Sequence, residues 1–114
     1  MLIELDVADT PSKRMIGLLK TKELLETKGL FIPNCRAIHT FGMQYSIDVV
    51  FINKQLKIIK VIQSCLPNRL AWSFESYSVI ELKGGFCIKW PSYSEIIYNS
   101  LCALAEAGVI TKYT

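Results

Sequence analysis

The sequence predicts an α+β protein with a mainly antiparallel sheet, either a partly open β-barrel or a curled sheet, and with helices near both ends. Three observations predict this class. Short β-branched and aromatic runs alternate with tight turns along the middle of the chain, and helix-start signals occur near Pro11 and near Tyr93. With 51% hydrophobic and 20% charged residues among 114, the composition is that of a globular protein. We expect a single globular domain over residues 1–114.

The first 19 residues predict a strand followed by a helix. Apolar and acidic residues alternate over residues 3–7, which indicates a half-buried strand. Thr10 is a suitable helix cap, and Pro11 fits the first helical position. The predicted helix then continues to about residue 19.

The middle of the chain predicts a series of short strands separated by turns. They cover residues 29–32, 37–41, 47–52, 56–62, 72–74 and 77–82. Asn53-Lys54-Gln55 predicts a hairpin turn, and Gly84-Gly85 ends the last strand. The strand 47–52 is apolar on both faces apart from Asp48, so we expect it to be central and covered on each side.

A C-terminal helix is predicted over residues 92–108, approximately. Ser92 and Glu95 have the spacing of a capping box, in which a serine caps a backbone N–H and the glutamate reaches back. An apolar stripe and the terminating Gly108 support the assignment. The stripe consists of Ile97, Leu101, Leu104 and Ala105.

Charge and cysteine usage narrow the functional classes. The net charge is +3, and no basic cluster is longer than Lys13-Arg14, so we expect no nucleic-acid partner. No apolar run approaches the roughly 18 residues of a membrane span. The N-terminus lacks a basic start followed by a continuous apolar stretch, so a cytoplasmic location is expected. Four cysteines and one histidine have no zinc spacing, and we expect free thiols, no metal site and no cofactor.

The stretch 34–53 contains the main candidates for chemistry. It holds the only histidine, His39, and nine residues later Asp48. Both side chains would sit in strand-like apolar surroundings, where polar groups require partners. The partner of Asp48 would be an arginine (Arg14, Arg36 or Arg69) or a set of backbone N–H groups. A buried structural network and a ligand site both remain open.

Two further features have a structural and a functional interpretation. Cys35 precedes His39 by four residues, but the chain has no G-x-S-x-G nucleophile motif, so hydrolysis is only the third hypothesis.

Aromatic residues gather in the second half of the chain. They form core packing, or else a platform that stacks a sugar ring or a partner peptide. They are Trp72, Phe74, Tyr77, Trp90 and Tyr93.

Four segments together resemble domain-of-unknown-function family 192, a bacterial and archaeal family. They are ADTPSKRMIGLL at 8–19, GLFI at 29–32, IHTFGMQYSIDVVFIN at 38–53 and VIELKGG at 79–85. The resemblance implies a compact α+β fold built on a partly open β-barrel, with a family-like core over about residues 1–90. It also implies a polysaccharide-related binding role, which has been suggested for the family from fold similarity, while the biochemical role is not established. The family's recurring polar set falls on Arg14, His39, Asp48, Arg69 and Glu81.

The chain departs from the family pattern in three places. Many members are exported with a signal peptide or lipid anchor, which this N-terminus does not resemble. Gly42 stands where the family has an aromatic residue before the methionine, here Met43. The predicted helix after Trp90 replaces the family's usual glycine-ended tail.

The sequence therefore predicts a small non-enzymatic binding protein for a carbohydrate or another polar small molecule. The candidate ligand-binding residues are Arg14, His39, Met43, Asp48 and Arg69, with Glu81 as a structural polar partner. The alternative is an accessory protein of a larger bacterial assembly, of the secretion or surface-structure type. A cysteine- or histidine-dependent hydrolase comes third. A concave pocket holding the polar set would favour a ligand, and a flat apolar patch would favour a protein partner.

Overall fold

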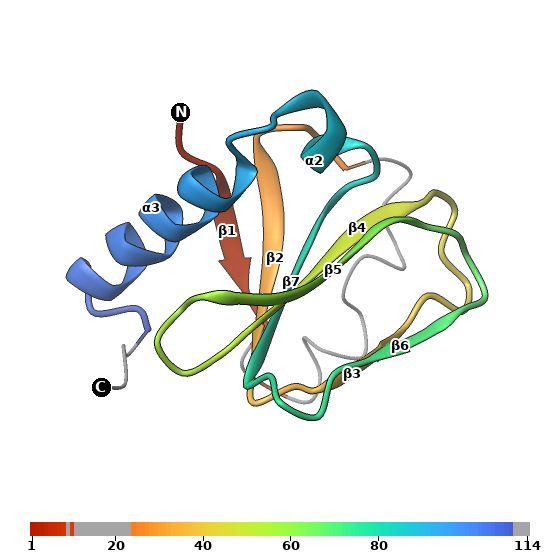
Figure 1. Ribbon diagram of the computed structural model, residues 1–114, viewed down its shortest axis with the longest axis horizontal. Coiled ribbons are helices and arrows are strands. Elements are labelled where there is room, and N and C mark those ends of the chain that lie inside the picture. Colours follow the sequence, from red (N-terminus) through yellow and green to blue (C-terminus); the bar gives the residue numbers. More distant parts are fainter. Residues whose placement is uncertain (9, 11–23, 111–114) are drawn as a thin grey trace.

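Five strands form the main sheet, in the order β1-β2-β7-β4-β5, and β3 and β6 form a second, two-stranded sheet (Figure 1). The computed structural model describes residues 1–8, 10 and 24–110. The elements in chain order are β1 (Glu4–Val7), β2 (Lys28–Pro33), β3 (Ala37–His39), β4 (Ile47–Ile52), β5 (Ile58–Cys65), β6 (Leu70–Trp72), β7 (Ser78–Lys83), α2 (Phe86–Lys89) and α3 (Tyr93–Glu106). The helix predicted from Pro11 lies outside the described residues.

The predicted fold class is confirmed. β2–β7, β7–β4 and β4–β5 pair antiparallel, as do β3 and β6, and the main sheet does not close into a barrel. One pairing is different, because β1 runs parallel to β2. Among the described residues, no helix is both long and apolar enough to cross a membrane.

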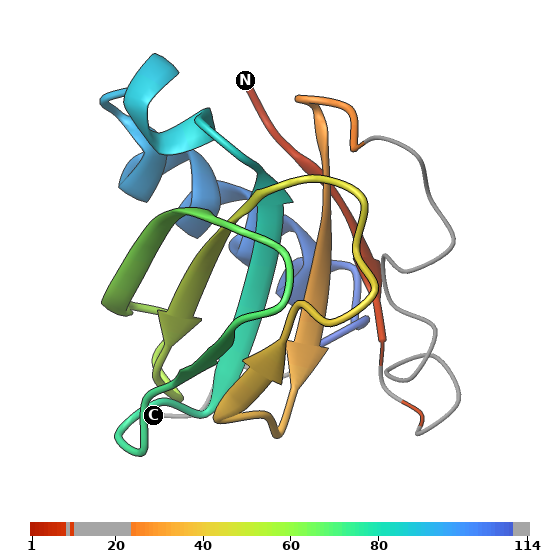
Figure 2. The same cartoon turned by 90° about the vertical axis from the view of Figure 1, so that its right-hand side faces the viewer.

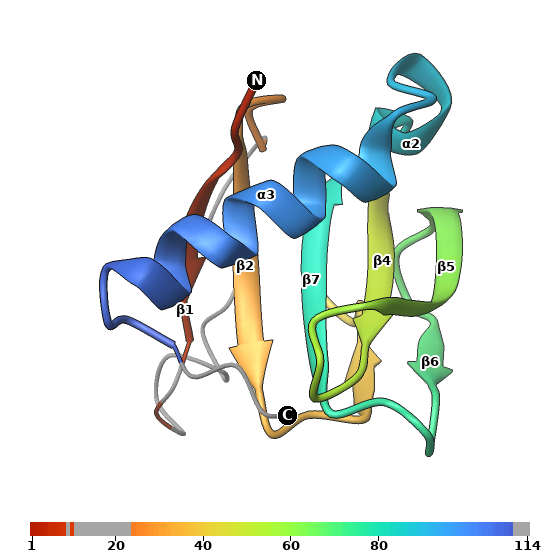
Figure 3. The ribbon, with the colours of Figure 1, turned by 60° about the vertical axis from the view of Figure 1, so that its left-hand side comes forward.

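β4 is the central strand, as predicted, and all six of its residues are buried. Val50 and Ile52 face the layer that contains α2 and α3. Ile47, Val49 and Phe51 face the opposite layer, together with Ile38 of β3 and Ala71 of β6. Figure 2 shows β3 and β6 packed beside the main sheet, and Figure 3 shows α3 lying across its other face. The sheet is therefore covered on both sides.

α3 begins where the sequence predicts, but the predicted capping box does not form. Ser92 makes no side-chain cap hydrogen bond, and its backbone carbonyl instead accepts from the N–H groups of Glu95 and Ile96. On the buried side, the Ser100 hydroxyl donates to the Ile96 carbonyl at 2.7 Å and accepts the Ile3 N–H at 2.9 Å. This pair of bonds ties α3 to the chain just before β1. Beyond the helix, Gly108 adopts a φ of 77°, the left-handed conformation expected of a C-terminal stop.

The turn between β4 and β5 contains an unusual residue. Asn53 organises the turn, since its side-chain oxygen accepts from the N–H groups of Gln55 and Lys57, both at 3.0 Å. Leu56 then has a φ of 65°, a left-handed conformation in which a leucine is strained. Its side chain is only 5% exposed and packs in the layer under α3. Burial of an apolar side chain offsets the backbone strain at this position.

Substitutions of Leu56 separate these two effects. Leu56→Ala removes the buried side chain and keeps the strained φ, so we expect a loss of roughly 2–5 kcal/mol in the free energy of unfolding. Leu56→Gly removes the same side chain but relieves the strain, so it should be more stable than the alanine variant by about 1 kcal/mol. Urea unfolding of both variants measures the difference. An alanine variant more stable than the glycine variant would show that residue 56 is not left-handed.

Candidate functional site

The carboxylate of Asp48 joins three separate segments of the chain. Its Oδ1 accepts the N–H groups of Ser64 at 2.8 Å and Gly85 at 3.0 Å, and its Oδ2 accepts the N–H of Cys87 at 2.8 Å. The residue is fully buried. Of the two kinds of partner that the sequence left open, the described part of the chain therefore supplies backbone N–H groups. Two of these donors belong to the start of α2, where backbone N–H groups lack partners within the helix.

Local backbone geometry brings the donors to Asp48. Ser64 has a φ of 50°, next to a register shift between β4 and β5 that separates the pairs Ile47–Cys65 and Val49–Ile62. Gly85 has a φ of 90°, which favours glycine. A Cβ on Gly84 would lie 2.8 Å from the carbonyl oxygen of Ser46, so this position also needs glycine. The glycine pair in VIELKGG thus lets the chain turn toward Asp48.

Burial keeps two of the four thiols protonated. Burial raises the pKa of the Cys87 thiol to about 12, and the adjacent Asp48 carboxylate contributes in the same direction. Burial also raises the pKa of Cys65. The nucleophile of a cysteine enzyme is a thiolate, so neither residue has the required character. None of the four cysteines forms a disulfide, and Cys35 and Cys102 are half-buried.

Thr40 anchors the loop that leads into β6. Its hydroxyl donates to the Leu66 carbonyl at 2.7 Å and accepts the Arg69 N–H at 2.9 Å, and its backbone N–H donates to the Arg69 carbonyl. Thr40 is not among the residues predicted from the sequence. The available signal was its position two residues after Ile38, on the inward side of the strand. Met43 lies nearby in sequence, is buried, and packs in the same apolar layer as Ile38.

The outer side of the two-stranded sheet carries exposed apolar side chains. The register pairs Ala37 with Trp72 and His39 with Leu70, while the intervening Ile38–Ala71 pair points inward and is buried. The His39 ring stacks on the ring of Phe41, with centroids 5.2 Å apart. We call the surface formed by Ala37, His39, Phe41, Leu70 and Trp72 the β3–β6 face. Phe74, 79% exposed, follows Trp72 by two residues.

Cationic side chains surround the β3–β6 face. Arg36 lies beside one end, where its carbonyl accepts the Ser73 N–H, and Arg69 lies beside the other, next to Thr40. Lys60 donates from Nζ to the Trp72 carbonyl at 2.8 Å. All three side chains are exposed, and the adjoining segment 66–76 contains a single carboxylate, Glu75. The surroundings of this face are therefore net positive.

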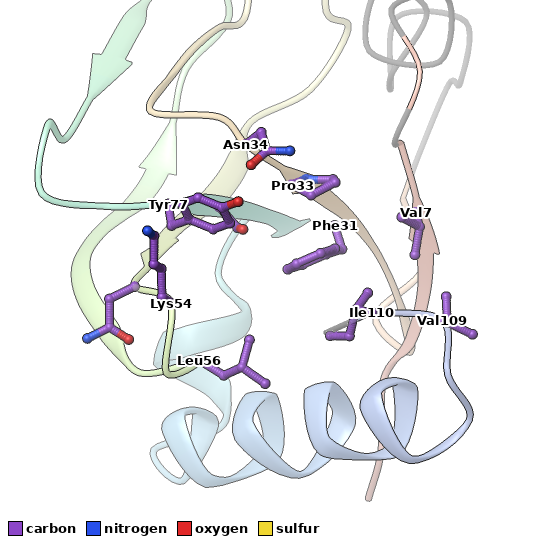
Figure 4. A pocket seen from close by; sticks show the side chains of 11 residues that line it. Val7, Phe31, Pro33, Asn34, Lys54, Leu56, Tyr77, Val109 and Ile110 are labelled. Atoms are coloured by element: carbon purple, nitrogen blue, oxygen red, sulfur yellow. The ribbon is translucent and has the colours of Figure 1, made fainter. Parts of the chain in front are cut away.

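The predicted ligand-binding residues occupy different environments. His39 and Arg69 are exposed near the β3–β6 face, whereas Met43 and Asp48 are buried. The hydrogen bonds of Asp48 go to backbone groups and not to His39. Arg14 lies outside the described residues. A concave pocket of about 150 Å³ is lined by other residues, none of them from the predicted set (Figure 4). Binding of a ligand by this set stays a prediction.

Glu81 is a buried carboxyl group with apolar neighbours. It lies on β7 opposite Leu30 of β2 and Val49 of β4, and it is 6% exposed. Within residues 1–8, 10 and 24–110, no side chain or backbone group donates a hydrogen bond to it, so its role as a structural polar partner stays a prediction. Burial raises the pKa of Glu81 from 4.5 to about 7. The same described residues contain no cluster of three or more histidine, cysteine or acidic side chains that could hold a metal ion.

Asp48→Asn tests the role of the central carboxylate in stability. The amide keeps one oxygen acceptor but turns an N–H₂ group toward one of the backbone donors, so we expect a loss of about 1–3 kcal/mol in the free energy of unfolding. Asp48→Ala leaves all three donors unpaired and should lose more. Asp6→Asn, at an exposed position of β1, is the control and should change stability by less than about 0.5 kcal/mol. An Asp48→Asn protein that unfolds like the wild type would refute a structural role.

Glu81→Gln tests the buried carboxyl group through the pH dependence of stability. Because the folded pKa of about 7 exceeds the ordinary 4.5, the folded state retains a proton that the unfolded state releases between these pH values. The free energy of unfolding should therefore fall as the pH rises from 4.5 to 7 and stay level above 7. Glutamine removes this loss, so the variant should gain up to about 3 kcal/mol at pH 8 and little at pH 4. Urea unfolding at both pH values measures the gain, and Glu75→Gln, an exposed position, is the control. Equal gains at pH 4 and pH 8 would contradict it.

Comparisons with known proteins agree with this fold. The chain is similar to a protein of unknown function from Novosphingobium aromaticivorans, with 16% identity and a TM-score of 0.69 over 76% of this chain and 67% of that one. It is also similar to a putative transcription regulator from Sinorhizobium meliloti, with 20% identity and a TM-score of 0.69 over 75% of this chain and 71% of that one. No curated protein matches the sequence. At these identities the two structures establish the fold alone.

The family assignment comes from the sequence itself. A family model matches residues 1–91, which include all seven described strands and α2. α3 lies beyond the match. Both the extent of the match and the fold lead to one conclusion: the chain belongs to the DUF192 family, described as "Uncharacterized ACR".

Proposed function

We propose that this protein is a non-enzymatic interaction module that binds a protein partner through the β3–β6 face. The observation that carries the proposal is the exposure of large apolar side chains on one side of a small sheet. Phe41, Leu70 and Trp72 are 48%, 63% and 50% exposed. Contiguous exposed apolar surface is uncommon on monomeric proteins and marks interaction sites.

The residue types of this face are those of protein interfaces. Aromatic residues and arginine are enriched in interfaces, and tryptophan and arginine are frequent among the residues that dominate binding energy. Trp72 lies on the face, and Arg36 and Arg69 lie at its ends. The rigid sheet holds the exposed side chains at fixed spacing, since Ile38 and Ala71 anchor the same strands in the core. Binding a partner then costs little free energy for ordering the side chains of this face.

Charge indicates what kind of partner fits. Arg36, Lys60 and Arg69 surround the face, against the single carboxylate of Glu75. The proposed partner therefore presents apolar side chains bordered by aspartate or glutamate. A second copy of this chain fits less well, because self-association through this face would bring like charges together on a protein of net charge +3.

Carbohydrate binding is the second candidate, and the ring geometry favours it. The exposed Trp72 ring and the stacked His39–Phe41 pair offer flat aromatic surfaces to a sugar ring. His39 and Arg69 would donate hydrogen bonds to hydroxyl groups, and the buried Met43 and Asp48 would support the loops from inside. The single-domain organisation, the cytoplasmic location and the lack of nucleic-acid partners remain predictions.

The main proposal can be tested by selecting peptides from a random library with the wild-type protein as bait. Peptides that also bind the Trp72→Ser variant are removed beforehand. The enriched peptides should combine aromatic or leucine residues with acidic ones. Replacing one dominant interface residue costs at least about 2 kcal/mol, so their affinity should fall at least about 30-fold in Trp72→Ser and in Arg69→Glu. Fluorescence anisotropy measures both losses.

Ile88→Ser is the matched control, because Ile88 is an exposed apolar residue on α2, away from the β3–β6 face. Its affinity for the peptides should equal that of the wild type. Peptides that bind Trp72→Ser as tightly as the wild type would refute the proposal. The second candidate can be tested in native gels that contain a soluble polysaccharide. Slower migration of the wild-type protein, but not of Trp72→Ser, would support carbohydrate binding instead.

A further inference from the structure

We propose that the β3–β6 face receives an amphipathic helix of the partner, with an apolar stripe bordered by aspartate or glutamate. This assignment rests on the function proposed above, because it concerns the same face, and it adds the kind of structure that the partner presents. Three features favour a helix: the direction of the backbone hydrogen bonds in the two-stranded sheet, the spacing of its exposed side chains, and the charges at the ends of β6.

The backbone of the two-stranded sheet offers hydrogen bonds only in the plane of the sheet. β3 and β6 pair antiparallel from Ala37–Trp72 to His39–Leu70, so their N–H and C=O groups do not point out of the face. An extended peptide lying on this face would bury its own backbone groups against apolar side chains without partners, which costs free energy. A helix bonds these groups internally and covers the same side chains without that cost. The face therefore suits a helix, whereas an edge of the sheet would suit a strand.

The spacing of the exposed side chains matches the turns of a helix. Leu70 and Trp72 are two residues apart on β6, which separates them by about 6.7 Å along the strand. Residues one turn apart on a helix, at i and i+4, are separated by about 6.0 Å along its axis. A helix aligned with β6 would thus place two successive apolar side chains beside Leu70 and Trp72. Ala37, directly opposite Trp72, carries only a methyl group and leaves room for one of them.

The same match between a helix and a strand already occurs inside this protein. Figure 3 shows α3 lying across the main sheet. Ile97 and Leu101, one turn apart on α3, share an apolar cluster with Ile80 and Leu82, which are two residues apart on β7. The proposed complex would repeat this packing on the outer side of the two-stranded sheet.

Cationic groups at both ends of β6 would meet the borders of the apolar stripe. Arg69 directly precedes β6, and at the other end the Lys60 ammonium donates to the Trp72 carbonyl at 2.8 Å. Lys60 is exposed, and an ammonium has three N–H groups, so it can bind this carbonyl and a carboxylate together. Acidic side chains about one turn from the apolar contacts of the partner helix would pair with Lys60 and Arg69. Charge complementarity therefore selects an acidic helix over a basic one.

Two peptide libraries of equal composition test the proposal. In the first, apolar residues recur at every third or fourth position with glutamates beside them, and in the second they alternate with glutamate. Both libraries are selected with the wild-type protein, after removal of peptides that bind Trp72→Ser. We expect enrichment from the first library alone. A proline in the middle of an enriched peptide should weaken binding at least about tenfold, because it breaks the helix.

The charge is tested on the protein. Lys60→Glu should weaken the binding of an enriched peptide about tenfold. Lys28→Glu is the matched control, since Lys28 is an exposed lysine at the first residue of β2, and it should leave the affinity unchanged. Fluorescence anisotropy measures both affinities. Equal affinities of Lys60→Glu and the wild type would overturn the acidic border of the helix.

The outcomes separate the helix from the interaction face. Enrichment from the alternating library, or enriched peptides that tolerate the internal proline, would overturn the helix and leave a protein partner at the β3–β6 face in place. Enrichment from neither library would overturn the helix and count against the proposed function as well. The proline test alters the peptide and not the protein, so it does not depend on the folding of a variant.

Discussion

The buried carboxylate of Asp48 is the interaction on which the rest of the structure depends. It sits in the central strand and accepts N–H groups from β5, from the glycine turn and from the first turn of α2. A buried charge of this kind is tolerated only when it is hydrogen-bonded, and within the described part of the chain backbone donors fulfil that condition. Because α2 leads directly into α3, the same contact fixes where the helical layer begins on the sheet. The family segment IDVVFIN thus contains the acceptor, Asp48, and the family segment VIELKGG contains the glycine turn that brings backbone N–H donors to it.

Much of the fold could be predicted from the sequence because strands and turns have local signals. Alternation, turn residues and the apolar run 47–52 identified every described strand to within a few residues. The parallel partner of β1 could not be predicted, since alternation indicates a strand and not its neighbour. α2 spans four residues, about one helical turn, which is too short for an apolar pattern to repeat. At Ser92 the backbone carbonyl accepts the hydrogen bond that was assigned to the hydroxyl. The donors to Asp48 are backbone groups, which no pattern of side-chain types reveals.

The candidate site was harder to predict than the fold because side-chain type does not determine which side of a surface a residue occupies. Asp48, a candidate for ligand binding, is buried, and so is Glu81, the predicted structural polar partner. Aromatic residues for which core packing was one interpretation, Trp72 and Phe74, are exposed. The two-stranded sheet explains the second outcome. A pair of strands cannot bury both of its faces in so small a protein, so the inward Ile38–Ala71 pair completes the core, and the alternating positions place aromatic side chains outside.

The hydrogen bond between Ile3 and Ser100 spans 97 residues of chain, and that separation has a consequence during synthesis. The apolar layer that α3 covers includes Ile80 and Leu82 of β7 and Phe86 of α2, all translated before α3. A nascent chain that has emerged only as far as the end of the DUF192 match presents these side chains to solvent, because α3 does not yet cover them. At translation speeds of about 5–20 residues per second, α3 follows within seconds. During that interval the exposed apolar surface favours non-native association, and the docking of α3 ends its exposure.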